Sequence, residues 1–154
     1  MRFGIVILPE YPWSQARDIW AKAEQYGFDH AWTYDHLAWR TLADDPWYSA
    51  IPTLTAAALV TTKMRLGTLV ASPNFRHPVP FAKELVTLDE ISGGRLNLGL
   101  GAGGIGFDAT VLGESVMPAR ARADRFIEFV ELLDQLLVGD HTTVEGEYFV
   151  AEDA

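Results

Sequence analysis

Asp35 and His36 lie at the end of an expected strand over residues 28–33, just after Tyr34. The ordinary pKa of a histidine lies near neutrality, so a histidine in this place can donate or accept a proton at a bound reactant. The alternative is a carboxylate that caps a loop beside a solvated imidazole. The dipeptide is therefore a candidate acid–base site, with His36 as the catalytic candidate.

Further candidate residues follow two short apolar runs. Ser72 comes directly after the run 66–71, and the glycine-rich stretch 101–104 comes after the run 96–100. Short apolar runs without long alternation are typical of strands covered on both faces, and ligands of parallel sheets lie beyond the carboxyl ends of the strands. Glycines there let the backbone approach a planar or anionic ligand. The alternatives are a strand-end turn residue for Ser72 and a tight turn for the glycines.

These residues are carried by alternating strands and helices. Such alternation indicates a parallel sheet with helices outside, either an open doubly wound sheet or part of a (β/α)8 barrel. The first strand-to-helix turn lacks the glycine fingerprint of a dinucleotide fold, and a complete barrel takes roughly 250 residues. We therefore expect a single domain over residues 1–154, made of four β-α units of a barrel and a short tail. The expected strands are 3–8, 28–33, 65–71 and 95–100; the expected helices are 14–26, 49–62, 78–92 and 119–138; a hairpin or extended tail is expected over 142–150.

The last and longest expected helix has an apolar stripe that runs from Phe126 to Leu137. The residues expected on its wet side are Arg122, Arg125, Glu128 and Glu131.

Composition excludes several classes of function. The 154-residue chain has a net charge of −9 and no cysteine, which disfavours nucleic-acid binding and excludes disulfides and thiolate chemistry. No apolar run is long enough for a membrane helix, and the N-terminal run is too short for a signal peptide, so a cytoplasmic location is expected. No histidines or carboxylates show metal-ligand spacing, and no metal is predicted.

The order and spacing of several segments resemble the N-terminal half of the bacterial luciferase-like superfamily. This resemblance implies a (β/α)8-barrel oxidoreductase that uses FMN or the deazaflavin F420 on a small organic substrate, as a monooxygenase or by hydride transfer. The resemblance of residues 35–36 and 65–78 to F420 users favours F420, with FMN as the alternative. The segments that carry it are Thr33–His36, Leu66–Pro78, Leu88–Leu96, Gly99–Gly103, Arg122–Leu137 and Gly146–Phe149.

The resemblance also implies roles for individual residues. Asp35 would contact the cofactor, and His36 would lie at its reactive face. A non-proline cis peptide between Leu69 and Val70 would lie behind the flavin ring. The Ser72 hydroxyl would contact the cofactor, with the backbone of Ala102 and Gly103 forming a wall of its site.

One departure from the family pattern limits the reaction class. Gly104 stands where the sugar-phosphate dehydrogenases of this superfamily carry a catalytic glutamate, so that chemistry is in doubt. Three loop aromatics, Trp39, Trp47 and Phe107, are candidates for an apolar substrate pocket or for simple loop packing. Arg76 and His77 are candidates either for an anionic cofactor tail or for capping the third helix.

Family members are about twice as long as this chain, so we expect a truncated copy or one half of a split protein. The alternatives to an enzyme are a cofactor-binding module without catalysis and a non-functional folding fragment. A half barrel would expose two sheet edges and an apolar inner face, and would therefore form a homodimer or bind a complementary C-terminal half. The residues proposed for that face are Ile5, Ile7, Leu66, Thr68, Leu96 and Leu98, or their alternates along the strands.

Overall fold

The computed structural model describes residues 1–39 and 42–154. The loop expected between the second strand and the second helix includes Arg40 and Thr41, which lie outside the described residues. The chain divides into two compact units, the first formed by residues 1–71 and 87–100 and the second by residues 72–86 and 101–154. A single domain over the whole chain stays a prediction.

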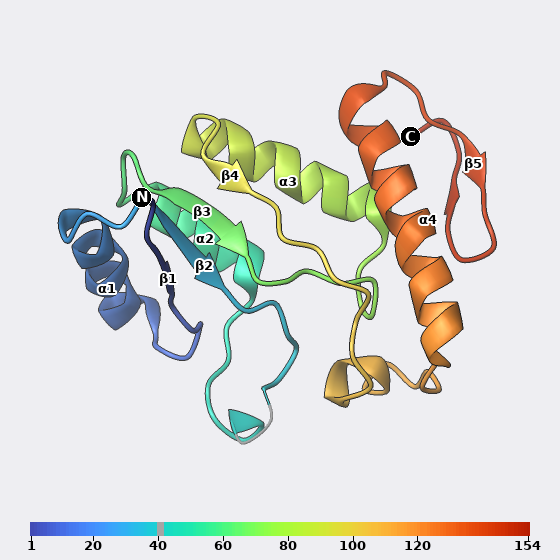
Figure 1. Cartoon of the computed structure of the whole chain (residues 1–154), viewed down its shortest axis with the longest axis horizontal. Coiled ribbons are helices and arrows are strands. Elements are labelled where there is room, and N and C mark those ends of the chain that lie inside the picture. The colour runs from blue at the N-terminus through green and yellow to red at the C-terminus, as the bar shows by residue number, and fades with distance from the viewer. Residues whose placement is uncertain (40–41) are drawn as a thin grey trace. The chain divides into compact units, whose positions relative to one another are not determined.

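The first unit contains a four-stranded sheet in the order β1-β2-β3-β4, and each neighbouring pair is parallel (Figure 1). The predicted strand order is confirmed. The hydrogen-bonded strands are shorter than the predicted apolar runs, but a further parallel bridge joins Ala71 to Leu100. The polar and glycine-rich residues therefore begin where strand pairing ends. The strands are β1 Gly4–Val6, β2 His30–Thr33, β3 Arg65–Thr68 and β4 Leu96–Asn97.

Helices α1 (Trp13–Gln25) and α2 (Ala50–Ala58) belong to the same unit. Helix α2 contacts both β3 and α1. Ala31 and Leu66 are neighbours in register, and both are completely buried. Small and branched apolar side chains at these positions leave room for the close approach of the helix layer.

The opposite face of the sheet is polar. The indole Nε1 of Trp32 donates a 2.6 Å hydrogen bond to His30 Nδ1, and Arg65 Nε donates one of 2.6 Å to Asn97 Oδ1. Because His30 is in register with Arg65, and Trp32 with Gly67, these side chains share one face. Leu66 and Thr68 have the other orientation and are completely buried. Of the two alternate sets of residues proposed for the inner face, the set without Leu66 and Thr68 forms the open face. It carries a histidine, an arginine and an asparagine besides Trp32 and Val6, so it is less apolar than expected.

Helix α3 (Pro78–Ser92) begins and ends at the predicted residues, and Arg95 lies just beyond it. Within the first unit, the Arg95 guanidinium donates to Ser92 O at 2.6 Å, Thr61 Oγ1 at 2.9 Å and Ala58 O at 2.8 Å. These bonds satisfy backbone carbonyls at the ends of α2 and α3, which helix termini leave without partners. Residues 88–96 are one of the segments that carry the family resemblance. Through Arg95 they connect the ends of α2 and α3 by hydrogen bonds, so their role here is structural.

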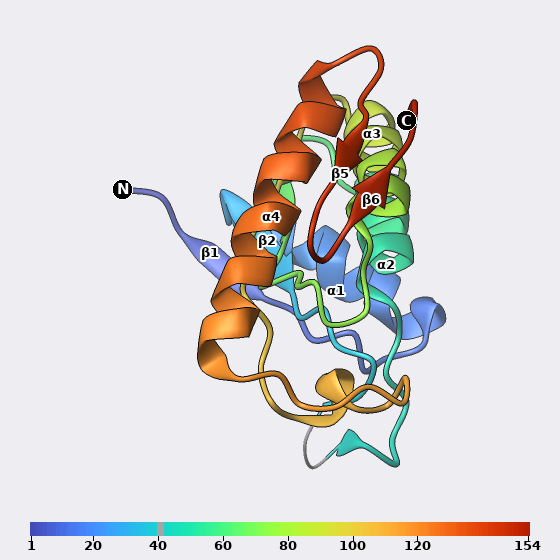
Figure 2. The ribbon, with the colours of Figure 1, turned by 90° about the vertical axis from the view of Figure 1, so that its right-hand side faces the viewer.

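In the second unit, helix α4 (Ala119–Val138) is followed by an antiparallel hairpin of β5 (Val144–Glu145) and β6 (Val150–Ala151) (Figure 2). The expected helix and hairpin are both confirmed. Three phenylalanines pack against one another in the core of the second unit. Ring centroids lie 6.1 Å apart for Phe81 and Phe129, and 5.7 Å apart for Phe129 and Phe149.

The prediction of the solvent-exposed side of α4 is wrong at two positions, Arg125 and Glu128. Glu128 accepts backbone hydrogen bonds from Tyr148 at 2.9 Å and Phe149 at 2.6 Å, and so holds the hairpin loop against the helix. Arg125 is half-buried and donates to Asn74. Helical periodicity locates only the strongest apolar face, whereas this helix has neighbours on a second face as well.

Candidate functional site

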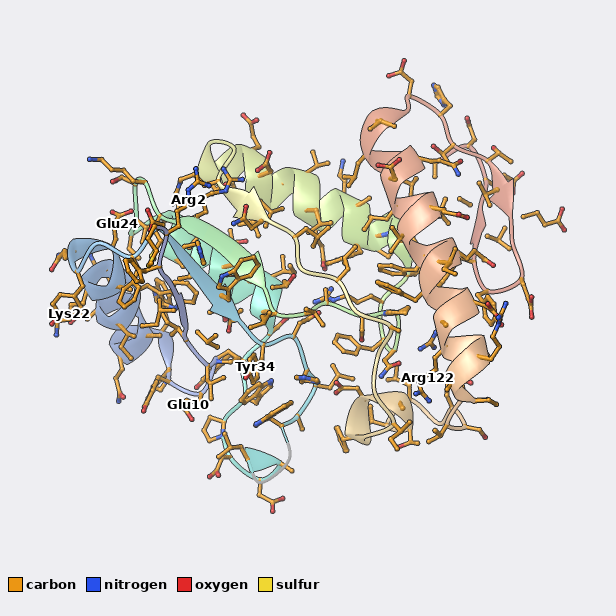
Figure 3. The ribbon with its side chains drawn as sticks, viewed as in Figure 1. Arg2, Glu10, Lys22, Glu24, Tyr34 and Arg122 are labelled. Carbon is orange, nitrogen blue, oxygen red and sulfur yellow. The ribbon has the colours of Figure 1, made fainter. Side chains whose placement is uncertain are left out.

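An aromatic cluster surrounds the candidate catalytic histidine at the carboxyl end of β2. The His36 ring centroid lies 4.7 Å from that of Trp39 and 6.3 Å from that of Tyr34. Trp39 in turn stacks on Trp47, with centroids 6.3 Å apart and planes inclined by 17°. Figure 3 labels Tyr34 where the chain leaves β2. Of the three aromatics proposed for a substrate pocket, two therefore gather around His36, while Phe107 belongs to the second unit.

The loop that carries His36 is held by a specific hydrogen bond. Trp47 Nε1 donates to the backbone carbonyl of His36 at 2.9 Å. The Asp35 side chain next to it is buried, with 3% of the residue exposed, whereas His36 is partly exposed. Buried carboxylates persist in proteins only with partners, so Asp35 is a fixed part of this loop and His36 is its accessible group.

The end of β3 lies beside this loop. Leu69 N donates to Thr33 O at 2.8 Å, which places Leu69 next to the end of β2. The peptide bond between Leu69 and Val70 is cis, as the family resemblance implies. Leu69 is 40% exposed, so it presents apolar surface at the edge of the sheet that carries Asp35 and His36.

Three more predicted cofactor residues lie in the second unit. Ser72 is buried, with 6% exposed, whereas Ala102 and Gly103 are partly exposed. Gly103 has a φ of +81°, and a Cβ there would collide with the side chain of Asn74. Asn74 packing thus explains why this residue is a glycine without reference to a ligand.

The predicted site residues thus fall into two groups. Asp35, His36 and Leu69 belong to the first unit, where Leu69 is hydrogen-bonded to Thr33, two residues before Asp35, and Ser72 and Gly103 belong to the second. The convergence of the two groups into one cofactor site stays a prediction.

The sequence did not reveal a cationic pocket in the second unit. This cavity of about 460 Å³ is lined by, among others, the cationic residues Arg76, Arg122 and Arg125 together with His77 and Asn74. Arg122 and Arg125 were assigned to solvent by helical periodicity, and nothing in the local sequence of Asn74 indicates a partner 51 residues away. Only Arg76 and His77 had been considered as contacts for an anion.

The remaining histidines have local partners. His77 Nδ1 accepts a 3.2 Å hydrogen bond from Val79 N, which is the capping alternative for this residue. His30 bonds Trp32, and His141 Nδ1 lies 2.8 Å from Asp153 Oδ1 on the surface. In the part of the chain that the structure describes, no three His, Asp or Glu side chains are grouped to hold a metal ion. No helix in that part is long and apolar enough to cross a membrane.

Comparison with known protein families shows to which family the chain belongs. The model of the luciferase-like monooxygenase family matches residues 1–154, and the chain belongs to this family. It is 38% identical over 135 residues to an F420-dependent glucose-6-phosphate dehydrogenase of Beutenbergia cavernae, covering 86% of this chain and 39% of that protein. It is 33% identical to the 5,10-methylenetetrahydromethanopterin reductase of Methanopyrus kandleri, covering 95% of this chain and 42% of that protein.

Solved structures give the same assignment. The monooxygenase RslO1 from Streptomyces bottropensis superposes with a TM-score of 0.80 at 31% identity, covering 98% of this chain and 47% of that one. An F420-dependent secondary alcohol dehydrogenase gives a TM-score of 0.84 at 26% identity, with 100% of this chain and 48% of that chain covered. The fold is the predicted one, parallel β-α units amounting to about half of a (β/α)8 barrel, and the chain spans about 40% of the length of the curated relatives.

Proposed function

We propose that this chain supplies the cofactor-binding half of an F420-dependent oxidoreductase, with FMN as the alternative cofactor. The observation that carries the proposal is that two neighbouring strands, joined by the Leu69 N to Thr33 O hydrogen bond, lead into candidate groups: β2 leads into His36 with its aromatic cluster, and β3 leads into the exposed Leu69. A flat heteroaromatic ring needs an apolar surface, a backbone edge and a nearby proton carrier, and these residues fit that need. Relatives named as F420-dependent enzymes support F420.

The protein's own residues have three tasks in this proposal. When bound, the deazaflavin or flavin supplies the hydride or oxygen chemistry. His36 holds or accepts a proton at its imidazole, and Trp39 and Trp47 exclude water from the histidine's side of the site. Asp35 and the Leu69–Val70 segment hold the ring, with Ser72, Ala102 and Gly103 completing the binding site.

The substrate is a small organic molecule whose identity stays open. Gly104 provides no side chain that could act as a base, so we do not extend to this chain the sugar-phosphate reaction named for several relatives, including that of Beutenbergia cavernae. The partner that we propose for the chain covers the open sheet. It is either a second copy, which gives a homodimer, or a complementary C-terminal half that covers the polar face of β1–β4.

Titration of F420 and of FMN into the chain, followed by cofactor fluorescence, tests binding. Turnover is then measured for the chain alone and for the chain with a complementary half, and the variants are compared in the assembly that oxidises or reduces a substrate. His36→Ala should lower turnover by about 10²–10⁴-fold with little loss of cofactor affinity, because a positioned acid or base contributes that much. His141→Ala, on the surface beside Asp153, is the matched control.

Equal loss of cofactor affinity with unchanged turnover would make His36 a binding residue. Cofactor binding without turnover in any assembly would favour a binding module. A chain without near-ultraviolet circular dichroism would identify a folding fragment and overturn the proposal.

A further inference from the structure

The cationic pocket concentrates positive charge in an acidic protein. The chain has 12 Lys and Arg against 21 Asp and Glu, yet Arg76, Arg122 and Arg125 all line this one cavity. Among the lining residues that the structure describes, the carboxylate is that of Glu114. Such an arrangement differs from an ordinary solvated surface, on which opposite charges are interspersed.

Arg76 is compensated within the protein. Its Nη1 lies 3.0 Å from Glu84 Oε2, and its guanidinium carbon lies 4.5 Å from the centre of the Phe81 ring. Its side chain is only 10% exposed. Arg76 therefore forms a wall of the pocket, and its charge is already balanced.

The hydrogen bonds of the other two arginines run to neutral oxygens. Arg125 Nη2 donates to Asn74 Oδ1 at 2.7 Å, and Arg122 Nη1 donates to Met117 O at 2.8 Å. Arg125 Nε is buried and has no hydrogen-bond partner among the residues that the structure describes. Burial, and then the charge of Arg122, lower the pKa of Arg125, while Tyr148 and Glu114 act in the opposite direction. Two adjacent guanidinium groups and an unpaired buried N–H are a costly arrangement that an anion would relieve.

The pocket is joined to the glycine-rich loop through Asn74. Asn74 Nδ2 donates to Gly104 O at 3.3 Å while its Oδ1 accepts from Arg125. The same side chain occupies the space that a Cβ of Gly103 would need. Arg125 is thereby fixed at one edge of the loop, and Arg122 projects from the first turns of α4 (Figure 3).

We propose that the cationic pocket binds an oxyanion, a phosphate or carboxylate group, between Arg122 and Arg125. Planar guanidinium forks match the oxygen spacing of both groups and bind them by charge-assisted hydrogen bonds. The anion belongs either to the cofactor or to a separate small molecule. Only the first of these sources rests on the proposed function.

Calorimetric titration of inorganic phosphate at low ionic strength tests the pocket itself. Arg122→Gln and Arg125→Gln should each weaken phosphate binding about tenfold or more, because each removes a charge-assisted hydrogen bond. Arg120→Gln is the control, since it removes the same charge from the same helix at a side chain that is 89% exposed and paired with Asp124. It should leave the affinity within about twofold, as expected for a screened surface charge.

Parallel titrations of FMN and riboflavin identify the source of the anion. If the cofactor supplies it, FMN binds more tightly than riboflavin, and Arg122→Gln removes that advantage. If a separate molecule supplies it, phosphate binding depends on both arginines while the ratio of FMN to riboflavin affinity does not. Phosphate binding without binding of any flavin or F420 would leave the pocket standing and reject the proposed function.

Nuclear magnetic resonance provides a second measurement in case Arg125→Gln does not fold. Phosphate should shift the backbone signals of Asn74, Gly103 and Gly104 in the wild-type chain and much less in Arg122→Gln. Absence of saturable phosphate binding, equal weakening by Arg120→Gln, or shifts confined to other segments would each overturn the proposal.

Discussion

Trp47 Nε1 donates a 2.9 Å hydrogen bond to the backbone carbonyl of His36 and thereby connects the two ends of the loop between β2 and α2. The bond fixes the backbone of the candidate catalytic residue, and the ring of the same tryptophan stacks on Trp39. The loop is thus supported by a polar and an apolar contact from one side chain.

Trp47→Phe should keep the aromatic stacking and remove the hydrogen bond. We expect a loss of about 0.5–1.5 kcal/mol in the free energy of unfolding, the usual net contribution of one hydrogen bond. The His36 imidazole signals should also broaden or shift in nuclear magnetic resonance spectra. Trp13→Phe, on α1 and 38% exposed, is the matched control. Unchanged His36 signals in Trp47→Phe would show that the bond does not position this residue.

Arg95 is expected to matter more for stability than any exposed arginine. Arg95→Met retains most of the side chain's length but leaves the carbonyls of Ala58 and Ser92, and the hydroxyl of Thr61, without their donor. Unsatisfied buried acceptors cost about 1–3 kcal/mol each, so a loss of about 2–4 kcal/mol is expected in urea unfolding. Arg120→Met serves as the control at an exposed site. Equal stability of the two variants would contradict the structural role given to residues 88–96.

Glu24 should contribute a pH-dependent part of the stability. Burial raises the pKa of Glu24, but backbone hydrogen bonds from Met64, Lys63 and Thr62 and the Thr62 hydroxyl together lower it below its ordinary value of 4.5. Figure 3 labels this residue in the last turn of α1. A carboxylate whose folded-state pKa is depressed stabilises the fold above its unfolded-state pKa, and this stabilisation is lost as pH falls through the folded-state pKa.

The difference in stability between the wild type and Glu24→Gln should therefore be constant near neutral pH and shrink below about pH 4.5, the region of the unfolded-state pKa. Urea unfolding at a series of pH values measures it. Glu131→Gln, which removes a carboxylate from the exposed side of α4, is the charge-matched control. If both variants show the same pH dependence, the hydrogen bonds of Glu24 are not its source.

The sequence predicted those features correctly whose signals lie within a few residues of the feature itself. Helices α3 and α4 begin and end at the predicted residues because proline, glycine and apolar periodicity act within a few residues. The parallel order of the strands followed from β-α alternation alone. The Asp35–His36 dipeptide became a candidate through its residue types and its place after a strand, whereas the cis bond between Leu69 and Val70 was expected only through family resemblance, since it has no local physical signal of its own.

The failures involved contacts between distant segments. Arg125 and Glu128 were assigned to solvent because periodicity does not show that Asn74 and the 147–149 loop pack against the same helix. The polar open face of the sheet was missed because strands that are short and lack alternation do not reveal which residues face the helices. In each case the missing information was a tertiary neighbour.

The last prediction concerns association through the open sheet. Strand β1 pairs only with β2 in the described sheet; Phe3 directly before it is 57% exposed, and Val6 at its end is 42% exposed. Edge strands pair with other chains unless charge, proline or covering segments prevent it. We expect the chain to self-associate at low micromolar concentration in sedimentation experiments.

Val6→Lys puts a charge on the β1 edge and should shift the population toward monomer. Val138→Lys, at the end of α4 and 80% exposed, makes the same substitution away from the sheet and should leave association unchanged. A complementary half that covers the sheet should compete with self-association. A wild-type chain that sediments as a single monomeric species at this concentration would show that the open edge and the polar face are stable in water without a partner.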